Sequence, residues 1–206
     1  MEGVNVEQLL ESARRGELDP LGQLLRSYQN YLTILAASQL DRRVRRRVSP
    51  SDLVQETMLA AHRDFPKFRG RSEPEFLAWL RQVFLSSLRH SIDEHVRAKK
   101  RDIRCEVSID QTLERLDRSA ECLAVQLADP GPSPSATVRR RERAVELADQ
   151  LALLKPEYRD VIVLRNLQGL KFEEIAERLG RKPGTVRMLW LRAMEKLRQT
   201  VAPSEA

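Results

Sequence analysis

The chain has 206 residues, enough for one large domain or two small ones, and its 41% hydrophobic but only 5% aromatic residues favour helical bundles over sheets. Its net charge of +6 suits a polyanionic partner, although an ordinary basic protein has the same total. No run approaches 18 apolar residues, and no basic segment precedes a long apolar run at the N-terminus. Neither export nor membrane insertion is therefore expected, and we place the protein in the cytoplasm.

Residues 20–40 predict the first helix, because apolar side chains recur there at spacings of three and four. Its buried face comprises Leu21, Leu24, Leu25, Tyr28, Leu32 and Leu35. Five arginines follow within residues 42–47, a run that fits a solvated face or loop.

A second helix is predicted to begin at Pro50, with Ser49 as its cap and Asp52 at its third position. Its apolar stripe contains Val54, Met58, Ala61 and Phe65. The opposite face is a polar cluster within an otherwise basic segment, which indicates a docking site for an external partner. This cluster contains Asp52, Gln55, Glu56 and Arg63.

A loop rich in Pro and Gly, PKFRGRSEP, ends at a second predicted cap, Ser72 with Glu75. The long helix after it has an apolar stripe made of Phe76, Leu80, Val83, Phe84, Ser87 and Leu88. Trp79 lies at the edge of this stripe, beside the polar residues Gln82, Ser86, His90 and Asp93. Two interpretations stay open: the indole stacks on an unpaired base, or it completes the core.

Residues 105–137 predict a flexible linker, since they lack a long periodic run and contain ADPGPSPSA. The linker region is acidic, with 2 Lys and Arg against 6 Asp and Glu over 105–138. Basic blocks flank it, with 16 against 9 over 41–104 and 11 against 6 over 155–198. This distribution favours a polyanion gripped at two places. Cys105 and Cys122 lack the spacing of metal ligands, so we expect both to be free thiols. We expect neither a metal nor a cofactor.

Helical periodicity resumes through Val145, Leu147, Leu151 and Leu154, and Pro156 begins another helix that Gly169 ends. A helix-turn-helix is then predicted, although a plain helical hairpin has a similar pattern. The short first helix contains Phe172, Ile175, Ala176 and Leu179, and Gly180 makes the turn. Val186, Leu189, Ala193 and Leu197 mark the second helix.

The two faces of this second helix differ in chemistry. We expect the inner, apolar face to contain Val186, Leu189, Trp190, Ala193, Met194 and Leu197. The outer face suits a DNA major groove, because arginines reach guanine edges or phosphates and apolar side chains touch thymine methyls. This outer face comprises Arg181, Gly184, Thr185, Arg187, Met188, Leu191 and Arg192.

Three stretches together resemble the extracytoplasmic-function sigma factors of the sigma-70 family: SDLVQETMLAAHRDFPKFRG, FLAWLRQVFL, and LKPEYRDVIVLRNLQGLKFEEIAERLGRKPGTVRMLWLRAMEKLR. The resemblance covers roughly residues 18–202. The composition of the linker and the stretch VRMLW at 186–190 are most similar to the planctomycete-type subgroup. It implies an all-α protein of two small domains. Residues 1–104 would form a sigma region 2-like domain, 105–137 the acidic Pro-rich linker, and 138–202 a sigma region 4-like helix-turn-helix domain.

The resemblance also implies partners and site residues. Core RNA polymerase would be bound through its beta-prime clamp and beta flap, with Asp52, Gln55 and Glu56 on the clamp. Recognition and melting of the promoter -10 element would fall to Lys67, Phe68, Arg69, Arg71, Trp79 and Gln82. Recognition of the -35 element would fall to Arg181, Lys182, Thr185, Arg187, Met188, Leu191 and Arg192. The acidic linker would run near the RNA exit path and mimic nucleic acid.

The chain departs from the family at Leu85, Ser86 and His90, where many members continue W-L-x-x-I-A-R-N and then an Asp. Control by a separate anti-sigma factor, a kinase or expression level is expected, because no appended sensor is visible. The competing hypothesis is a stand-alone helix-turn-helix regulator that binds duplex DNA. An enzyme is not supported, since the sequence has no Gly-rich phosphate loop, no metal-spaced cluster and no nucleophile-base arrangement.

Overall fold

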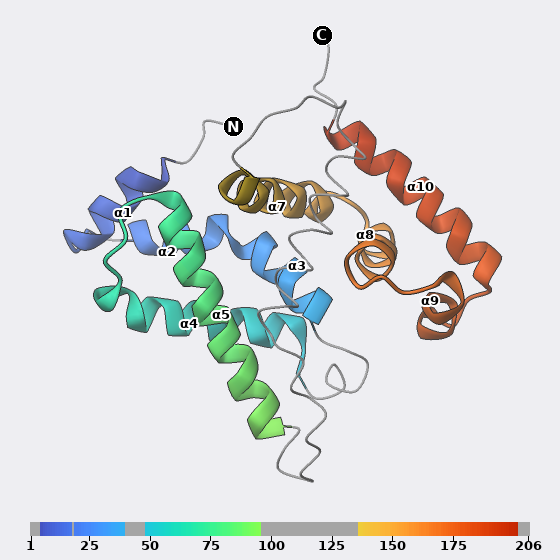
Figure 1. Ribbon diagram of the computed structural model, residues 1–206, viewed down its shortest axis with the longest axis horizontal. Coiled ribbons are helices and arrows are strands. Elements are labelled where there is room, and N and C mark those ends of the chain that lie inside the picture. The colour runs from blue at the N-terminus through green and yellow to red at the C-terminus, as the bar shows by residue number, and fades with distance from the viewer. Residues whose placement is uncertain (1–4, 18, 40–47, 96–135, 202–206) are drawn as a thin grey trace. The chain divides into compact units, whose positions relative to one another are not determined.

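The structure is a computed structural model that describes residues 5–17, 19–39, 48–95 and 136–201 (Figure 1). Every regular element within these ranges is helical, which confirms the all-α prediction. The chain divides into two compact units, Met1–Ala36 with Leu40–Ile109, and Ala37–Gln39 with Asp110–Ala206. The arginine run at 42–47 and nearly all of the expected linker at 105–137 lie outside the described residues. No helix in the described ranges is long and apolar enough to cross a bilayer.

The first unit contains α1 (Val6–Arg14), α2 (Pro20–Ser27), α3 (Gln29–Gln39) as far as Ala36, α4 (Pro50–Asp64), a 3-10 turn η1 (Phe65–Lys67) and α5 (Glu73–His95). Helices α4 and α5 pack against each other, and α1 packs against α2. Their core is made of side chains that are fully buried, among them Leu10, Leu24, Leu32, Leu53, Phe76, Leu80, Phe84 and Leu85. Leu85, one of the departures from the family pattern, is therefore a core residue.

Both predicted helix caps are confirmed. Ser49 Oγ accepts a hydrogen bond from the Asp52 amide at 3.1 Å, and α4 begins at Pro50. Glu75 Oε2 accepts from the Ser72 amide at 3.0 Å and from Ser72 Oγ at 2.9 Å, at the start of α5. These contacts satisfy amides that a helix start leaves without an intrahelical partner.

The beginning of the chain differs from the sequence prediction in two ways. Helix α1 was not predicted, yet Asn5 caps it by accepting from the Gln8 amide at 3.1 Å, and it buries Val6 and Leu10. The single helix expected over 20–40 is two helices, α2 and α3, separated at Tyr28. Apolar periodicity does not reveal this break, because the Leu32 amide still donates to the Tyr28 carbonyl at 3.0 Å.

The second unit contains α7 (Ala136–Ala152), α8 (Pro156–Ile162), a π-helical segment η4 (Val163–Leu167), α9 (Phe172–Leu179) and α10 (Pro183–Val201). The predicted helix-turn-helix is confirmed, and Gly180 makes its turn with a left-handed φ of 63°. Gly169 ends the preceding helical stretch with φ 72°. The inner face of α10 is confirmed, since five of its six expected residues are buried: Val186, Leu189, Ala193, Met194 and Leu197.

Candidate nucleic-acid interface

The polar face of α4 is open to solvent at Asp52 and Gln55. Glu56 is half-buried, because Ser91 Oγ on α5 donates a hydrogen bond to its Oε2 at 2.7 Å. Leu59 lies one helical turn beyond this group and is 73% exposed. Sequence reasoning missed Leu59, although it follows Gln55 by four residues and Glu56 by three and therefore lies on the same face. The face therefore combines two carboxylates, an amide and an apolar side chain.

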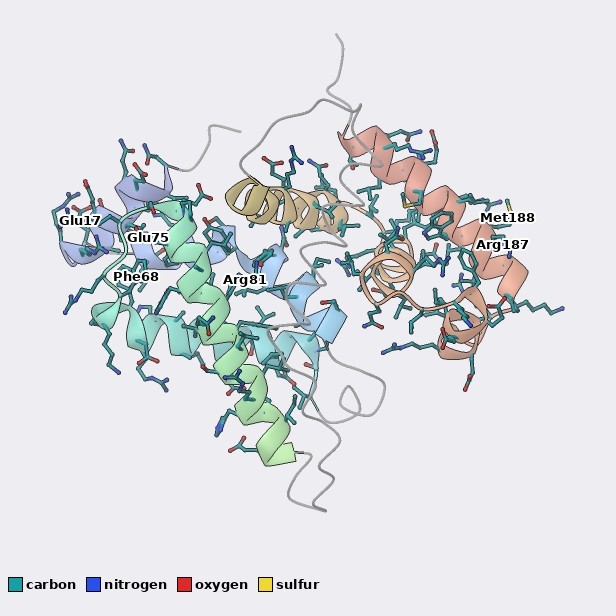
Figure 2. The ribbon with its side chains drawn as sticks, viewed as in Figure 1. Glu17, Phe68, Glu75, Arg81, Arg187 and Met188 are labelled. Carbon is teal, nitrogen blue, oxygen red and sulfur yellow. The ribbon has the colours of Figure 1, made fainter. Side chains whose placement is uncertain are left out.

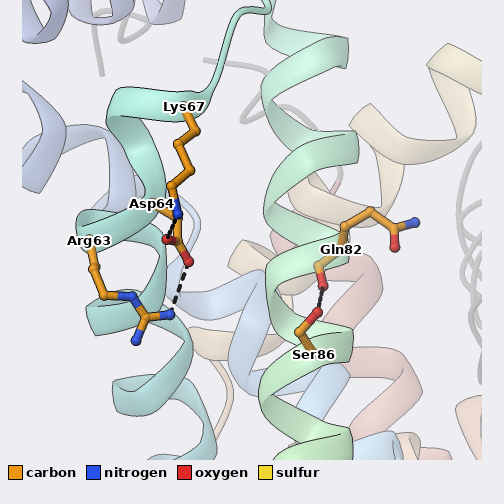
Figure 3. A network of polar contacts seen from close by, with 5 residues as sticks. All are labelled: Arg63, Asp64, Lys67, Gln82 and Ser86. Atoms are coloured by element: carbon orange, nitrogen blue, oxygen red, sulfur yellow. Dashed lines mark hydrogen bonds and ion pairs between the residues drawn. The ribbon is translucent and has the colours of Figure 1, made fainter.

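A groove of about 770 Å³ runs between α4 and α5. Its lining has mixed chemistry: Glu56, Leu59, Ala60, Arg63 and Asp64 come from α4, and Trp79, Gln82, Val83, Ser86, Ser87 and His90 from α5. At one end Asp64 accepts from Arg63 Nη2 at 3.0 Å and from Lys67 Nζ at 3.2 Å (Figure 3). The hydrogen bond from Arg63 has the larger effect and the one from Lys67 the smaller, and both lower the pKa of the Asp64 carboxyl. On the opposite side of the groove Ser86 Oγ donates to the backbone carbonyl of Gln82 in the same helix, 3.0 Å away, and the side chains of both residues are exposed.

Phe68, one of the residues expected to contact the -10 element, is only 8% exposed. Its ring centroid lies 5.0 Å from that of Trp79, 5.8 Å from Phe76 and 6.0 Å from Phe65. The loop between α4 and α5 turns this ring inward because the apolar faces of both helices meet there. Trp79 is half-buried in the same cluster and also lines the groove, so it completes the core and keeps an accessible side.

The loop that follows α4 presents three exposed cations, Lys67, Arg69 and Arg71. Its backbone is fastened at both ends: the Phe68 amide donates to the Phe65 carbonyl at 2.9 Å, and the Arg71 amide donates to Glu75 Oε2 at 2.8 Å. The hydrogen bonds from the Arg71 and Ser72 amides lower the pKa of Glu75. The three cations therefore project from a backbone of defined shape.

The outer face of α10 and the turn before it are exposed at all seven residues expected to meet the -35 element: Arg181, Lys182, Thr185, Arg187, Met188, Leu191 and Arg192. Met188 is 51% and Leu191 47% exposed, and Figure 2 shows Arg187 and Met188 together on α10. A hollow of about 460 Å³ lies beside them, lined in part by Glu157, Tyr158, Thr185 and Arg192. This face offers cations, a hydroxyl and apolar groups to a partner.

Two of these arginines have fixed partners within the second unit. Arg181 Nη2 lies 3.2 Å from Glu157 Oε2 on α8. The Arg187 guanidinium lies 5.4 Å from the centroid of the Phe172 ring, and Arg165 lies 4.7 Å from the same centroid while donating to the Leu170 carbonyl at 2.9 Å. Cation-π contact with a shared ring thus orients Arg187 along the exposed face.

Trp190 differs from the prediction that it packs inward. The indole is half-buried, its Nε1 donates to Asn166 Oδ1 at 2.9 Å, and its ring meets the Phe172 ring edge to face at 5.8 Å. A tryptophan has a polar N–H that needs a partner, which explains its place at the margin of the core. Among the described residues, no cluster of His, Cys, Asp or Glu could hold a metal ion.

The chain matches known families over two stretches, which include the α4 face with its loop and the outer face of α10. Residues 24–101 match the family Sigma-70 region 2, and residues 144–197 match the family Sigma-70, region 4. The chain is 31% identical over 168 residues to RNA polymerase sigma factor CarQ of Myxococcus xanthus, covering 81% of this chain and 82% of that protein. It is 28% identical over 197 residues to ECF RNA polymerase sigma-E factor of Haemophilus influenzae, covering 96% and 95%. It is 26% identical over 202 residues to ECF RNA polymerase sigma factor SigD of Mycobacterium tuberculosis, covering 98% and 86%.

Proposed function

Because the chain belongs to the extracytoplasmic-function sigma factors of the sigma-70 family, which direct core RNA polymerase to promoters, we propose that it divides this task between its two units. The first unit binds core polymerase and recognises and opens the -10 element, and the second reads the -35 element. The observation that supports this division is that each unit has its own exposed cationic surface, the loop after α4 and the outer face of α10, while the polar face of α4 lies in the first unit. Sigma factors are generally not enzymes, and we propose that this one acts in the cytoplasm without chemistry of its own.

Core polymerase is bound through the exposed face of α4, by Asp52, Gln55 and Glu56 on the beta-prime clamp. The hydrogen bond from Ser91 holds the Glu56 carboxylate in one orientation, which lowers the entropy lost on docking. Leu59 adds an apolar contact at the next turn, where its 73% exposure leaves most of its surface available for burial.

The -10 element is recognised along the loop and the groove of the first unit. Lys67, Arg69 and Arg71 neutralise backbone phosphates, while the accessible side of Trp79 stacks on a base and Gln82 supplies an amide for hydrogen bonding. Phe68 serves from inside the core, where it fixes the shape of the loop and does not touch DNA.

The -35 element is read by α10 and the turn before it. Arg187, oriented by Phe172, is placed for a base edge, and Met188 and Leu191 are placed for thymine methyls. Arg181, Lys182, Thr185 and Arg192 contribute phosphate or base contacts around them.

The decisive experiment measures promoter-specific run-off transcription from a genomic promoter library with core polymerase. Wild type should join core and start defined transcripts, and Asp52→Ala and Gln55→Ala should weaken association with core. Glu11→Ala is the matched control, because it removes one exposed polar side chain from the same unit outside the α4 face. A stand-alone regulator would instead protect duplex DNA without polymerase and would be unaffected by the α4 variants.

A further inference from the structure

We propose that Arg14, the last residue of α1, is a positioning residue for the loop that recognises the -10 element. This inference rests on the function proposed above for that loop. It extends the -10 recognition module to a helix that lies before residues 24–101, the stretch that matches sigma-70 region 2.

Two contacts join Arg14 to the middle of the loop, 56 residues further along the chain. Arg14 Nη2 donates a hydrogen bond to the Gly70 carbonyl, and its guanidinium lies 5.7 Å from the centroid of the Phe68 ring. Figure 2 shows Phe68 and Glu75 at the same end of the unit as Glu17, which follows α1 closely in sequence. The planar guanidinium therefore covers an aromatic ring and binds a backbone carbonyl at the same time.

The hydrogen bond from Arg14 holds the middle of the loop, whereas the backbone hydrogen bonds of the loop lie at its two ends and Arg69 Nη1 donates to the Pro66 carbonyl at 3.4 Å. Phe68 is bonded back to Phe65, and Glu75 holds Arg71 and Ser72. Between them stands Gly70, packed so closely that an added Cβ would lie 2.5 Å from the Phe68 ring and 2.8 Å from Glu75 Cβ. Arg14 fixes the carbonyl of this glycine and so sets the direction from which Arg69 and Arg71 leave the backbone.

The charge of Arg14 is directed at the protein. Its guanidinium faces a carbonyl and a ring, and it also lies near enough to the Glu75 carboxylate to favour its ionised form. The adjacent Arg15 has different partners: its Nε lies 2.6 Å from Glu17 Oε1 and its Nη2 lies 2.8 Å from Ser12 Oγ. Two neighbouring exposed arginines thus carry the same charge, and Arg14 alone of the pair reaches the loop.

This difference supplies a matched test with holoenzyme on a promoter selected by run-off transcription. The measured quantity is the ratio of run-off transcription from the selected promoter to the amount of the factor bound to core polymerase, because contacts with phosphates act on every -10 sequence alike. Arg14→Ala should lower this ratio about tenfold, because only part of the energy of the charged hydrogen bond and the cation-π contact is transmitted to the position of the loop cations. Arg15→Ala should leave it unchanged. Arg14→Lys should recover only part of the loss, since an ammonium cannot cover the ring.

Association with core polymerase and the midpoint of thermal unfolding are measured for each variant. Arg14→Ala should keep its affinity for core, because α4 is untouched. Equal losses for Arg14→Ala and Arg15→Ala would show a general charge effect and overturn the inference, as would full recovery in Arg14→Lys. If Arg14→Ala does not fold, Arg14→Lys decides by the same ratio.

A loop variant, Lys67→Ala with Arg69→Ala and Arg71→Ala, separates this inference from its premise. If this variant keeps the wild-type ratio, the role proposed for the loop in -10 recognition fails. If it lowers the ratio and Arg14→Ala does not, the loop role stands and only the role of Arg14 fails.

Discussion

The two proposed DNA-facing surfaces both set arginine against an aromatic ring, but the ring has opposite roles in them. In the first unit the Phe68 ring is buried, and Arg14 covers it while holding a loop carbonyl. In the second unit the Phe172 ring is half-exposed and carries two guanidinium groups. One of these belongs to Arg165, which is fixed to the Leu170 carbonyl, and the other to Arg187, which lies on the exposed face of α10.

The difference follows from what each surface is built on. A loop has few backbone hydrogen bonds of its own, so the first surface uses Glu75, Gly70 and Arg14 to define its backbone. A helix defines its own backbone, so the second surface can use an aromatic contact to orient a side chain. In the first unit the arginine on the ring is part of the support, and in the second it is part of the proposed reading face.

The largest effects on stability should come from removing the aromatic ring that contacts arginine in each unit, and the two effects should be unequal. Phe68→Ala should lower the free energy of unfolding of the first unit by about 3–5 kcal/mol, because Phe68 is buried among other aromatic rings. Phe172→Ala should cost the second unit less, because its ring is half-exposed. Each unit contains one described tryptophan, Trp79 or Trp190, so denaturant unfolding followed by fluorescence in Trp79→Phe and Trp190→Phe backgrounds reports the units separately. Equal losses would remove the proposed difference between a structural and an orienting ring.

Two glycines sharpen the same comparison at the backbone. Gly70→Ala should lower the unfolding free energy of the first unit by about 1–3 kcal/mol, because the added methyl meets the Phe68 ring and Glu75. Gly184→Ala should raise that of the second unit by about 0.5–1 kcal/mol, since a Cβ on this residue of α10 meets nothing within 4 Å. The two changes are measured by the same unfolding experiment. A stabilised Gly70→Ala would contradict the close packing of the loop.

The contact between Arg187 and Phe172 should be visible as coupling in promoter binding. Phe172→Leu should weaken binding of the holoenzyme to a promoter with an intact -35 element by about 0.5–1 kcal/mol, the size of an exposed cation-π contact. It should have little further effect when Arg187 is already Ala, and a double-mutant cycle measures this. Fully additive losses would mean that Phe172 does not orient Arg187.

The smallest effect concerns the carboxylate that closes the loop. The folded pKa of Glu75 lies below its ordinary value of 4.5, because the Arg71 and Ser72 amides donate to the ionised form. The stabilisation by this carboxylate is therefore complete above about pH 4.5 and is lost as pH falls through the folded pKa. Glu75→Gln should be less stable than wild type at neutral pH, with a difference that shrinks in acid. Trp79 fluorescence during unfolding at several pH values measures it, and a constant difference would exclude the proposed origin.

The sequence predicts those parts of the molecule that short-range patterns encode. The caps at Ser49 and Ser72, the turn at Gly180 and the inner face of α10 each depend on residues within a few positions of one another. Residue patterns alone indicated a docking site on α4 and a DNA-binding face on α10, and resemblance to a family supplied core polymerase and the promoter elements as partners. These sites remain predictions for the experiments above.

What could not be predicted depends on contacts between distant residues. The hydrogen bond from Arg14 to the Gly70 carbonyl joins residues 56 positions apart, and no sequence pattern near either residue predicts it. The sequence around Phe68 predicts an exposed loop residue, but the ring is buried because it packs against Phe76 and Trp79 of α5. The missed helix α1 is different in kind, since Asn5, Val6 and Leu10 carry a local signal that was overlooked.

Around the π-helical segment η4, the number of residues between Pro156 and Gly169 matters as much as their type. Its consecutive residues Arg165 and Asn166 both support the helix-turn-helix, the first at the Phe172 ring and the second at the Trp190 indole. One residue corresponds to about 100° of rotation in a helix, so deleting a single residue here would turn both side chains away from their partners. Substitutions in this segment are therefore expected to be better tolerated than any insertion or deletion between Pro156 and Gly169.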